Sequence, residues 1–234
     1  MNYKKYTFNC IPSTQDFLRE KRALGENAVA VARKQSGGKG TKGRSFESRE
    51  GGLWLSILLF DEGVPAQDGF LMMARSAVAV CKTLEDYGLQ PKIKWANDVL
   101  VAGKKICGVL TENVCRGNFI VSTLFGIGIN INNTLGDDLQ EIATTLREQT
   151  GVEHDLQEVE QRLLSHFFAS FAFSEYAERL ALLGEEVAFC VGENTFAATL
   201  LGVSERGELF LEQDGRAVKY AYGEISLKKG REKV

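Results

Sequence analysis

The chain lacks the features that would assign it at once to a membrane, secreted or nucleic-acid-binding class. Its 234 residues carry a formal net charge of only −3. Such a balance gives no overall attraction to nucleic acid or to an anionic membrane, so any basic site must be local. No apolar run approaches the ~18 residues of a membrane span. The N-terminal "MNYKKYTFNC" also lacks the apolar stretch of a signal peptide.

The cysteines give no sign of a disulfide framework or of a CxxC motif. There are five of them, an odd number, and they are scattered along the chain. This pattern favours reduced and mostly buried thiols inside a cell. With 44% apolar and 25% charged residues, the composition is that of an ordinary globular protein. We therefore expect a cytoplasmic protein that binds neither DNA nor a membrane.

The order of apolar runs predicts an α+β fold in which a mixed sheet is backed by helices. Ser13 stands where a helix cap is expected, and Ala102-Gly103 is suited to a hairpin turn. Strands are expected at residues 3–11, 28–33, 53–60, 91–95, 98–114 and 118–131. Helices are expected at residues 15–24, 66–87, 137–149 and 155–180.

The pattern changes after Gly184, where short alternating segments replace the longer elements. Turn signals at 205–207 and 214–215 separate these segments at the regular spacing of a small barrel. The segments are residues 186–191, 195–203, 207–212 and 217–222. We therefore predict a first domain over residues 1–183 and a small C-terminal β-barrel domain over residues 184–234.

A glycine-rich stretch, "QSGGKGTKGRSF", follows the second predicted strand. Its spacing resembles both the dinucleotide fingerprint and, imperfectly, a P-loop. Each of those motifs needs a long helix directly after the glycines, because the helix N-terminus faces the phosphate. Here Gly51-Gly52 and then a strand follow instead. Neither motif therefore applies.

Two interpretations of this loop remain open. It can be a solvated flexible connection, or it can be a lid that orders over a phosphate-bearing ligand. Its length between two core strands favours a function. Lys39, Lys42 and Arg44 suit an anion, and the glycines permit close approach of the backbone.

Two further clusters carry polar residues at strand ends. Asn97-Asp98 can be a simple turn, which is the usual role of that pair. Lys105, however, precedes the apolar run "ICGVL", and an ammonium fixed there can bind a carboxylate or an α-phosphate. The third cluster, "GIGININ" at residues 126–132, ends a strand.

Taken together and in this order, the clusters resemble the biotin protein ligases, the biotin–[acetyl-CoA-carboxylase] ligases. The family's GRGRRGR loop is similar to residues 38–44, and its KWPND…KxxG stretch is similar to residues 94–98 with Lys105 and Gly108. Its DSTN, GxGINxN and C-terminal GEISL segments are similar to residues 12–15, 126–132 and 223–227. The resemblance spans residues 7–228. It implies a class II synthetase-like biotin/lipoate ligase catalytic domain and an SH3-like β-barrel, in the short form without an N-terminal DNA-binding domain.

The resemblance also implies a reaction. Biotin and ATP, with Mg²⁺, form biotinyl-5'-AMP, from which a lysine of the biotin carboxyl carrier protein or domain of a carboxylase takes the biotinyl group. Lys105 is the implied catalytic residue, and Asp98 the residue nearest to Mg²⁺. The implied biotin-binding residues are Ser13, Thr14, Gln15, Gln35, Lys39, Gly40, Thr41, Lys105 and Gly108. Those implied for ATP and the adenylate are Gly38, Lys39, Gly43, Arg44, Phe46, Asn97, Asp98 and Asn130.

The sequence departs from the family pattern at three positions. Lys39 and Thr41 stand where the family has arginine, so two planar bidentate donors are lost. Ala96 replaces the proline of KWPND, which restores a backbone N–H. Two alternatives stay open: a lipoate–protein ligase, and a non-catalytic biotin- or nucleotide-binding regulatory module. The identity of the carboxylase and the choice between monomer and homodimer are open as well.

Overall fold

A large mixed sheet forms the body of the molecule. The computed structural model describes residues 2–60 and 63–227. Its first sheet has eight strands, with β4 paired to β8 off the main order β1-β2-β3-β8-β7-β6-β5. Only β1 and β2 run parallel, joined by helix α1; the other pairs are antiparallel. The strands are β1 (Lys4–Ile11), β2 (Ala28–Gln35), β3 (Leu53–Leu59), β4 (Val64–Pro65), β5 (Lys92–Lys94), β6 (Asp98–Val101), β7 (Lys104–Arg116) and β8 (Phe119–Ile129). The prediction of a mixed sheet is confirmed.

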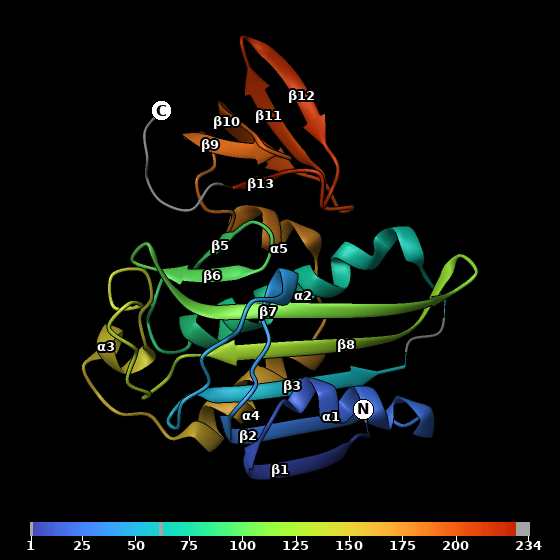
Figure 1. Cartoon of the computed structure of the whole chain (residues 1–234), viewed down its shortest axis with the longest axis vertical. Coiled ribbons are helices and arrows are strands. Elements are labelled where there is room, and N and C mark those ends of the chain that lie inside the picture. The colour runs from blue at the N-terminus through green and yellow to red at the C-terminus, as the bar shows by residue number, and fades with distance from the viewer. Residues whose placement is uncertain (1, 61–62, 228–234) are drawn as a thin grey trace.

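Helices cover both faces of this sheet, as Figure 1 shows. The helices are α1 (Thr14–Lys21), α2 (Gly69–Glu85), α3 (Leu146–Thr150), α4 (Leu156–Phe168) and α5 (Phe173–Glu178), with 3₁₀ turns η1 (Arg22–Leu24), η2 (Thr41–Gly43) and η3 (Ala66–Asp68). Strand β3 is buried along its whole length. Its side chains pack alternately into two hydrophobic clusters on opposite faces of the sheet. Leu55 and Ile57 belong to the cluster with α2 and α4, and Leu58 packs with Leu18 of α1. The run "LWLSILL" is therefore continuously apolar, apart from one serine, because both of its faces are covered.

Two of the predicted helices are wrong in extent. Residues 137–142 form turns, Ala143 forms a β-bridge with Lys105, and only Leu146–Thr150 is helical. The backbone of residues 142–144 is instead bonded to the start of β7, since Lys105 donates to Ile142 and Thr144 donates to Lys105. The helix expected over 155–180 breaks after Phe168, because Ala169 is extended and a separate α5 begins at Phe173. In the first of these places tertiary hydrogen bonding overrides the helical pattern.

The C-terminal strands form a second, five-stranded antiparallel sheet with the order β12-β11-β10-β9-β13. They are β9 (Glu186–Val191), β10 (Asn194–Val203), β11 (Leu209–Gln213), β12 (Arg216–Tyr220) and β13 (Ser226–Leu227). The predicted turn at 214–215 is confirmed, with Asp214 and Gly215 both at positive φ. The sheet is consistent with the expected SH3-like domain. Residues 228–234, the end of the predicted second domain, lie outside the described residues, and the boundary near 183 stays a prediction.

The two sheets share one hydrophobic core. Leu200 and Leu211 of the second sheet belong to the same buried cluster as α2 and β8. The loop before β11 packs tightly on α2 at Gly207, where an added Cβ would lie 2.2 Å from the Phe70 ring. The carbonyl of Gly207 also accepts a hydrogen bond of 3.2 Å from the indole of Trp95. Across residues 2–60 and 63–227, every helix is too short or too polar to span a lipid bilayer.

Candidate functional site

Three glycines lie close together on one face of the large sheet, so no Cβ projects from the backbone at that place. Gly108 of β7 pairs with Gly128 of β8, and Gly126 lies two residues earlier in β8, so all three lie on the same face of the sheet. We call these three residues the glycine floor. An added Cβ on Gly128 would lie 2.7 Å from the Phe46 ring, and one on Gly126 would lie 2.5 Å from Oε1 of Gln15. The floor is therefore covered by those two side chains, which fit only because the glycines have none.

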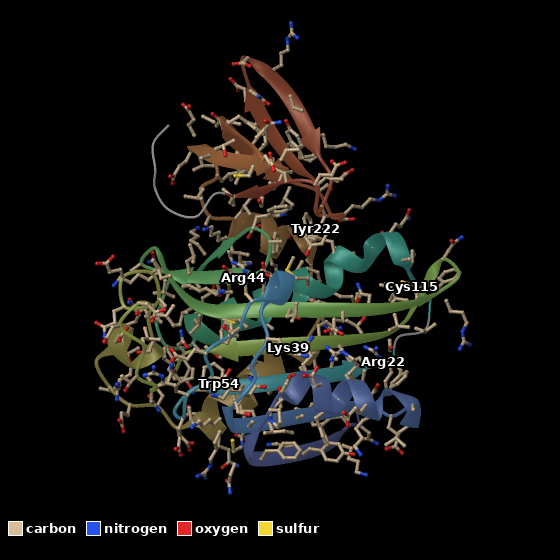
Figure 2. All side chains as sticks on the ribbon, viewed as in Figure 1. Arg22, Lys39, Arg44, Trp54, Cys115 and Tyr222 are labelled. Carbon is tan, nitrogen blue, oxygen red and sulfur yellow. The ribbon has the colours of Figure 1, made fainter. Side chains whose placement is uncertain are left out.

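The glycine-rich loop folds into a hairpin that crosses this face. Gly40 donates to the carbonyl of Arg44 at 2.7 Å, and Phe46 donates to the carbonyl of Gly38 at 2.8 Å. The Arg44 guanidinium also donates to the hydroxyl of Thr41 at 2.7 Å. Figure 2 shows Lys39 and Arg44 on this hairpin, in front of β7 and β8. Strand β3, and no long helix, follows the hairpin, so the exclusion of the dinucleotide and P-loop motifs is confirmed.

Lys105 and Asp98 form an ion pair at the edge of the glycine floor. Nζ of Lys105 lies 2.7 Å from Oδ1 of Asp98, and each side chain is about one-third exposed. Asp98 is the first residue of β6 and stands opposite Gly108. The ammonium also lies 5.5 Å from the centroid of the Phe46 ring. The pair is thus an oriented, partly exposed cation beside the floor that Phe46 and Gln15 cover.

The other two polar residues of these clusters mainly hold backbone in place. Nδ2 of Asn97 donates to the carbonyl of Val109 at 2.8 Å, which ties the turn before β6 to β7. The Trp95–Ala96 peptide bond at the start of this turn is cis. Asn130 is buried at the end of β8, and its Oδ1 accepts from Asn133 at 3.2 Å. Both asparagines are near the site, with their amides engaged in the fold.

The segment "STQ", residues 13–15, follows β1 and lies at one end of the glycine floor. Together with Gln35 we call it the wall. Ser13 caps α1 by accepting a hydrogen bond from the backbone of Asp16, as the sequence predicted. Thr14 donates from its backbone and from its hydroxyl to Oε1 of Gln35, at 2.8 and 3.0 Å. Nε2 of Gln35 donates in turn to Ser48 at 2.9 Å. The predicted residues Ser13, Thr14, Gln15 and Gln35 are therefore brought together.

A chain of alternating charges runs behind this wall, and the sequence analysis missed most of it. Lys39 of the loop lies 2.8 Å from Asp16, Asp16 is paired with Arg19, and Arg19 is paired with Glu112 of β7. Partial burial acts to raise the pKa of Asp16, but the hydrogen bonds from Lys39 and Arg19 outweigh it and lower that pKa below its usual value. The hydrogen bond to Glu112 raises the pKa of Arg19. The signal in the sequence was weak, because Glu112 stands between Thr111 and Asn113 in a mixed strand, and the only other sign is an Asp–Arg pair three residues apart on a helix.

Acidic residues do not gather into a metal cage in the part of the chain that is described. No group of three or more His, Cys, Asp or Glu side chains suited to a metal ion occurs there. Asp98, the residue expected nearest to Mg²⁺, has one oxygen engaged by Lys105. A Mg²⁺ ion usually keeps several waters and binds through substrate phosphates with one or two carboxylates. One carboxylate at this site fits that mode of binding.

Comparison with known proteins identifies the family. The model of the Biotin/lipoate A/B protein ligase family matches residues 7–130, which include the wall, the hairpin, the ion pair and the glycine floor. The chain belongs to this family. The match runs through the "STQ" segment, the glycine-rich loop and the "KWAND" stretch, and it ends at Asn130.

Similar proteins from several bacteria extend the likeness to the second sheet. The Bifunctional ligase/repressor BirA of Bacillus subtilis is 35% identical over 219 residues, which are 86% of this chain and 66% of that protein. The Biotin--[acetyl-CoA-carboxylase] ligase of Paracoccus denitrificans is 28% identical over 210 residues, 80% of this chain and 85% of that ligase. The biotin protein ligase from Aquifex aeolicus, solved with biotin and ATP, superimposes with a TM-score of 0.80 at 28% identity and covers 97% of this chain and 99% of its own.

Proposed function

We propose that this member of the biotin/lipoate ligase family is a biotin–[biotin carboxyl carrier protein] ligase. The observation that carries the proposal is the oriented Lys105 ammonium beside the glycine floor, under a loop that bears cations. The substrate carboxylate, the phosphates and the adenylate are all anionic, so a cation fixed at this edge stabilises charge where it develops. The biotin-using relatives, which match most of this chain, support the choice of substrate.

The reaction has two steps in which bonds balance without an added oxidant or reductant. An oxygen of the biotin carboxylate attacks the α-phosphorus of ATP, and the bond to the bridging oxygen breaks as pyrophosphate leaves. The amine of the carrier lysine then attacks the carbonyl carbon of biotinyl-5'-AMP, AMP leaves, and the nitrogen loses a proton. We assign to Lys105 the stabilisation of negative charge at the junction of carboxylate and α-phosphate. The absence of a side chain at Gly108 leaves room for the Lys105 ammonium and the Phe46 ring to lie against the backbone there.

The remaining residues fall into two groups by their position. Ser13, Thr14, Gln15 and Gln35, at the wall, are proposed to bind biotin together with Lys39, Gly40, Thr41, Lys105 and Gly108. Gly38, Lys39, Gly43, Arg44 and Phe46 on the hairpin, with Asn97, Asp98 and Asn130, are proposed to bind ATP and the adenylate. Mg²⁺ accompanies ATP, offsets phosphate charge, and would use Asp98 as its protein ligand.

Partners and location follow as further parts of the proposal. The acceptor is the biotin carboxyl carrier protein or domain of a carboxylase, such as acetyl-CoA carboxylase. All five cysteines are free thiols, but only Cys81 and Cys107 are buried, so the expectation of mostly buried thiols is wrong. Unpaired thiols are typical of a reducing compartment, which supports a cytoplasmic location. The net charge of −3 supports our expectation that the chain does not bind DNA.

The deciding experiment measures ATP–pyrophosphate exchange with biotin or lipoate as the carboxylic acid. We expect exchange that depends on biotin, and transfer of one biotinyl group to a lysine of an added carrier domain, detected by mass spectrometry. Exchange that depends on lipoate alone would reassign the chain to the lipoate branch of the family. Binding of biotin without any exchange would make it a regulatory module.

A further inference from the structure

The carboxamide of Gln15 is held in one orientation by a carboxylate. Its Nε2 donates to Oε1 of Glu112 at 2.9 Å. An ionised carboxylate can only accept hydrogen bonds, so the NH₂ group of Gln15 must face Glu112. The carbonyl oxygen, Oε1, consequently faces the other way, over Gly126 of the glycine floor.

Glu112 is itself fixed by a bidentate contact. Nη2 of Arg19 lies 2.6 Å from Oε1 of Glu112, and Nε of Arg19 lies 3.1 Å from Oε2. The two parallel N–H donors set the plane of the carboxylate as well as its position. Arg19 is anchored on α1 by Asp16, its neighbour one turn earlier. Gln15 thus receives its orientation from a rigid pair that spans α1 and β7.

The carbonyl oxygen of Gln15 is left as an acceptor without a protein donor among the described residues, on a side chain that is otherwise almost fully enclosed. Gln15 is only 5% exposed. Among the residues that the structure describes, no hydrogen-bond donor reaches its Oε1. The oxygen is not one of the fully buried unpaired atoms of the described residues, so it is open on the side of the glycine floor and can accept a hydrogen bond from a ligand placed there.

We infer that Arg19 and Glu112 are positioning residues that present the Gln15 carbonyl oxygen to an N–H group of the bound acid. This inference rests on the proposed function, since the ring urea of biotin carries such N–H groups. The dithiolane ring of lipoate has no N–H group to offer. A site that is built to bond a donor rejects a ligand that lacks the donor, because the acceptor is then left unpaired. The Arg19–Glu112 pair therefore contributes to the choice between the two acids.

The test uses Glu112→Gln, which keeps the size of the side chain but can donate as well as accept. Gln15 is then no longer compelled to turn its carbonyl oxygen toward the substrate. We expect the KM for biotin to rise about tenfold, about 1.4 kcal/mol, which is the scale of one hydrogen bond. The KM for ATP and the kcat at saturating biotin should stay within about twofold, because the lost interaction contributes equally to ground state and transition state.

A biotin analogue methylated on the ring-urea nitrogens separates positioning from general damage. The wild-type protein should prefer biotin to this analogue, and the preference should shrink in Glu112→Gln by the same factor by which the KM for biotin rises. A purely structural role would weaken both ligands alike and leave the ratio unchanged, which would overturn the inference. Glu158→Gln is the matched control, since Glu158 pairs with Arg162 in an exposed contact on α4. It should leave both ligands unaffected.

Two more outcomes keep the inference distinct from the proposed function. If Glu112→Gln does not fold, Arg19→Gln replaces it; freeing Glu112 to rotate should change the biotin preference in the same direction. A wild-type protein that neither binds biotin nor forms AMP from it would overturn the proposed function itself. Normal biotin binding together with an unchanged preference in both variants would overturn only the positioning role of Arg19 and Glu112.

Discussion

Replacing Lys105 by methionine tests the part of the site on which the proposed chemistry depends most. Methionine has a similar length and no charge, so Lys105→Met removes the ammonium and leaves most of the packing. In the structure that ammonium lies 2.7 Å from Asp98 and borders the glycine floor. We expect the variant to fold normally and to lose most of its biotin-dependent pyrophosphate exchange.

The two effects of this change differ enough in size to be separated. The ion pair with Asp98 is about one-third exposed, and exposed pairs typically contribute about 0–1 kcal/mol to stability. A preorganised group that stabilises developing charge contributes about 2.7–4 kcal/mol to the barrier, a factor of roughly 10²–10³ in kcat. Pyrophosphate exchange should therefore fall at least ~100-fold, while the free energy of unfolding in urea changes by at most about 1 kcal/mol.

The neighbouring lysine provides the control. Lys104 is exposed, and its Nζ donates to the carbonyl of Gln140 at 2.8 Å, away from the glycine floor. Lys104→Met removes the same charge one residue earlier and should keep nearly full exchange activity. If Lys105→Met exchanges pyrophosphate at a near-normal rate, Lys105 does not stabilise the reacting charge and the reasoning from its position is refuted.

Three other changes probe the floor, the loop and the contact between the sheets. Gly128→Ala places a Cβ 2.7 Å from the Phe46 ring, and this overpacking should lower the free energy of unfolding in urea by about 1–3 kcal/mol; an unchanged value would mean that the ring moves away freely. Asp16→Asn removes the tether to Lys39. Because the pKa of Asp16 is lowered in the folded state, the stability advantage of the wild type, under about 1 kcal/mol, should be complete above pH ~4 and should disappear as the pH falls through that lowered pKa. Urea titrations at several pH values measure it, and an advantage that persists in acid would contradict the assignment. Trp95→Phe loses the indole donor to the second sheet and leaves a buried carbonyl unpaired, so it should cost about 1–3 kcal/mol, seen as a Tm lower by roughly 2–4 °C for each kcal/mol.

Local patterns in the sequence predicted most of the helices and strands and the candidate residues of the site. The apolar runs "AVAVAR" and "LWLSILLF" predicted β2 and β3, because a strand that is covered on both faces is apolar at successive residues. Ser13 marked the start of α1 through its cap, and Ala102-Gly103 marked the hairpin between β6 and β7. The sequence also predicted that no helix follows the glycine-rich loop, which excluded the dinucleotide-binding and P-loop folds.

Interactions between distant segments could not be predicted from the sequence. Residues 137–145 have a helical pattern, yet they form turns and a β-bridge, with the backbone of Ile142 and Thr144 bonded to Lys105 at the start of β7. Glu112 and Arg19 are 93 residues apart, and only the packing of α1 on the sheet brings them into a bidentate pair. Neither local propensity nor spacing contains that information, since the free energy of such a contact exists only after the chain has folded.

The sequence by itself therefore determined which chemical groups are available, and the tertiary structure decided how they are oriented. The sequence shows the three glycines of the floor, Gly108, Gly126 and Gly128, but not that they lie together. They form the floor only because β7 and β8 pair in register, with alternate residues on one face. The sequence shows Lys105 as a cation before an apolar strand. The ion pair with Asp98 that orients its ammonium exists only because β6 pairs with β7. The physical reason is that a strand fixes the side of the sheet for each residue, while the neighbour opposite that residue is set by long-range pairing.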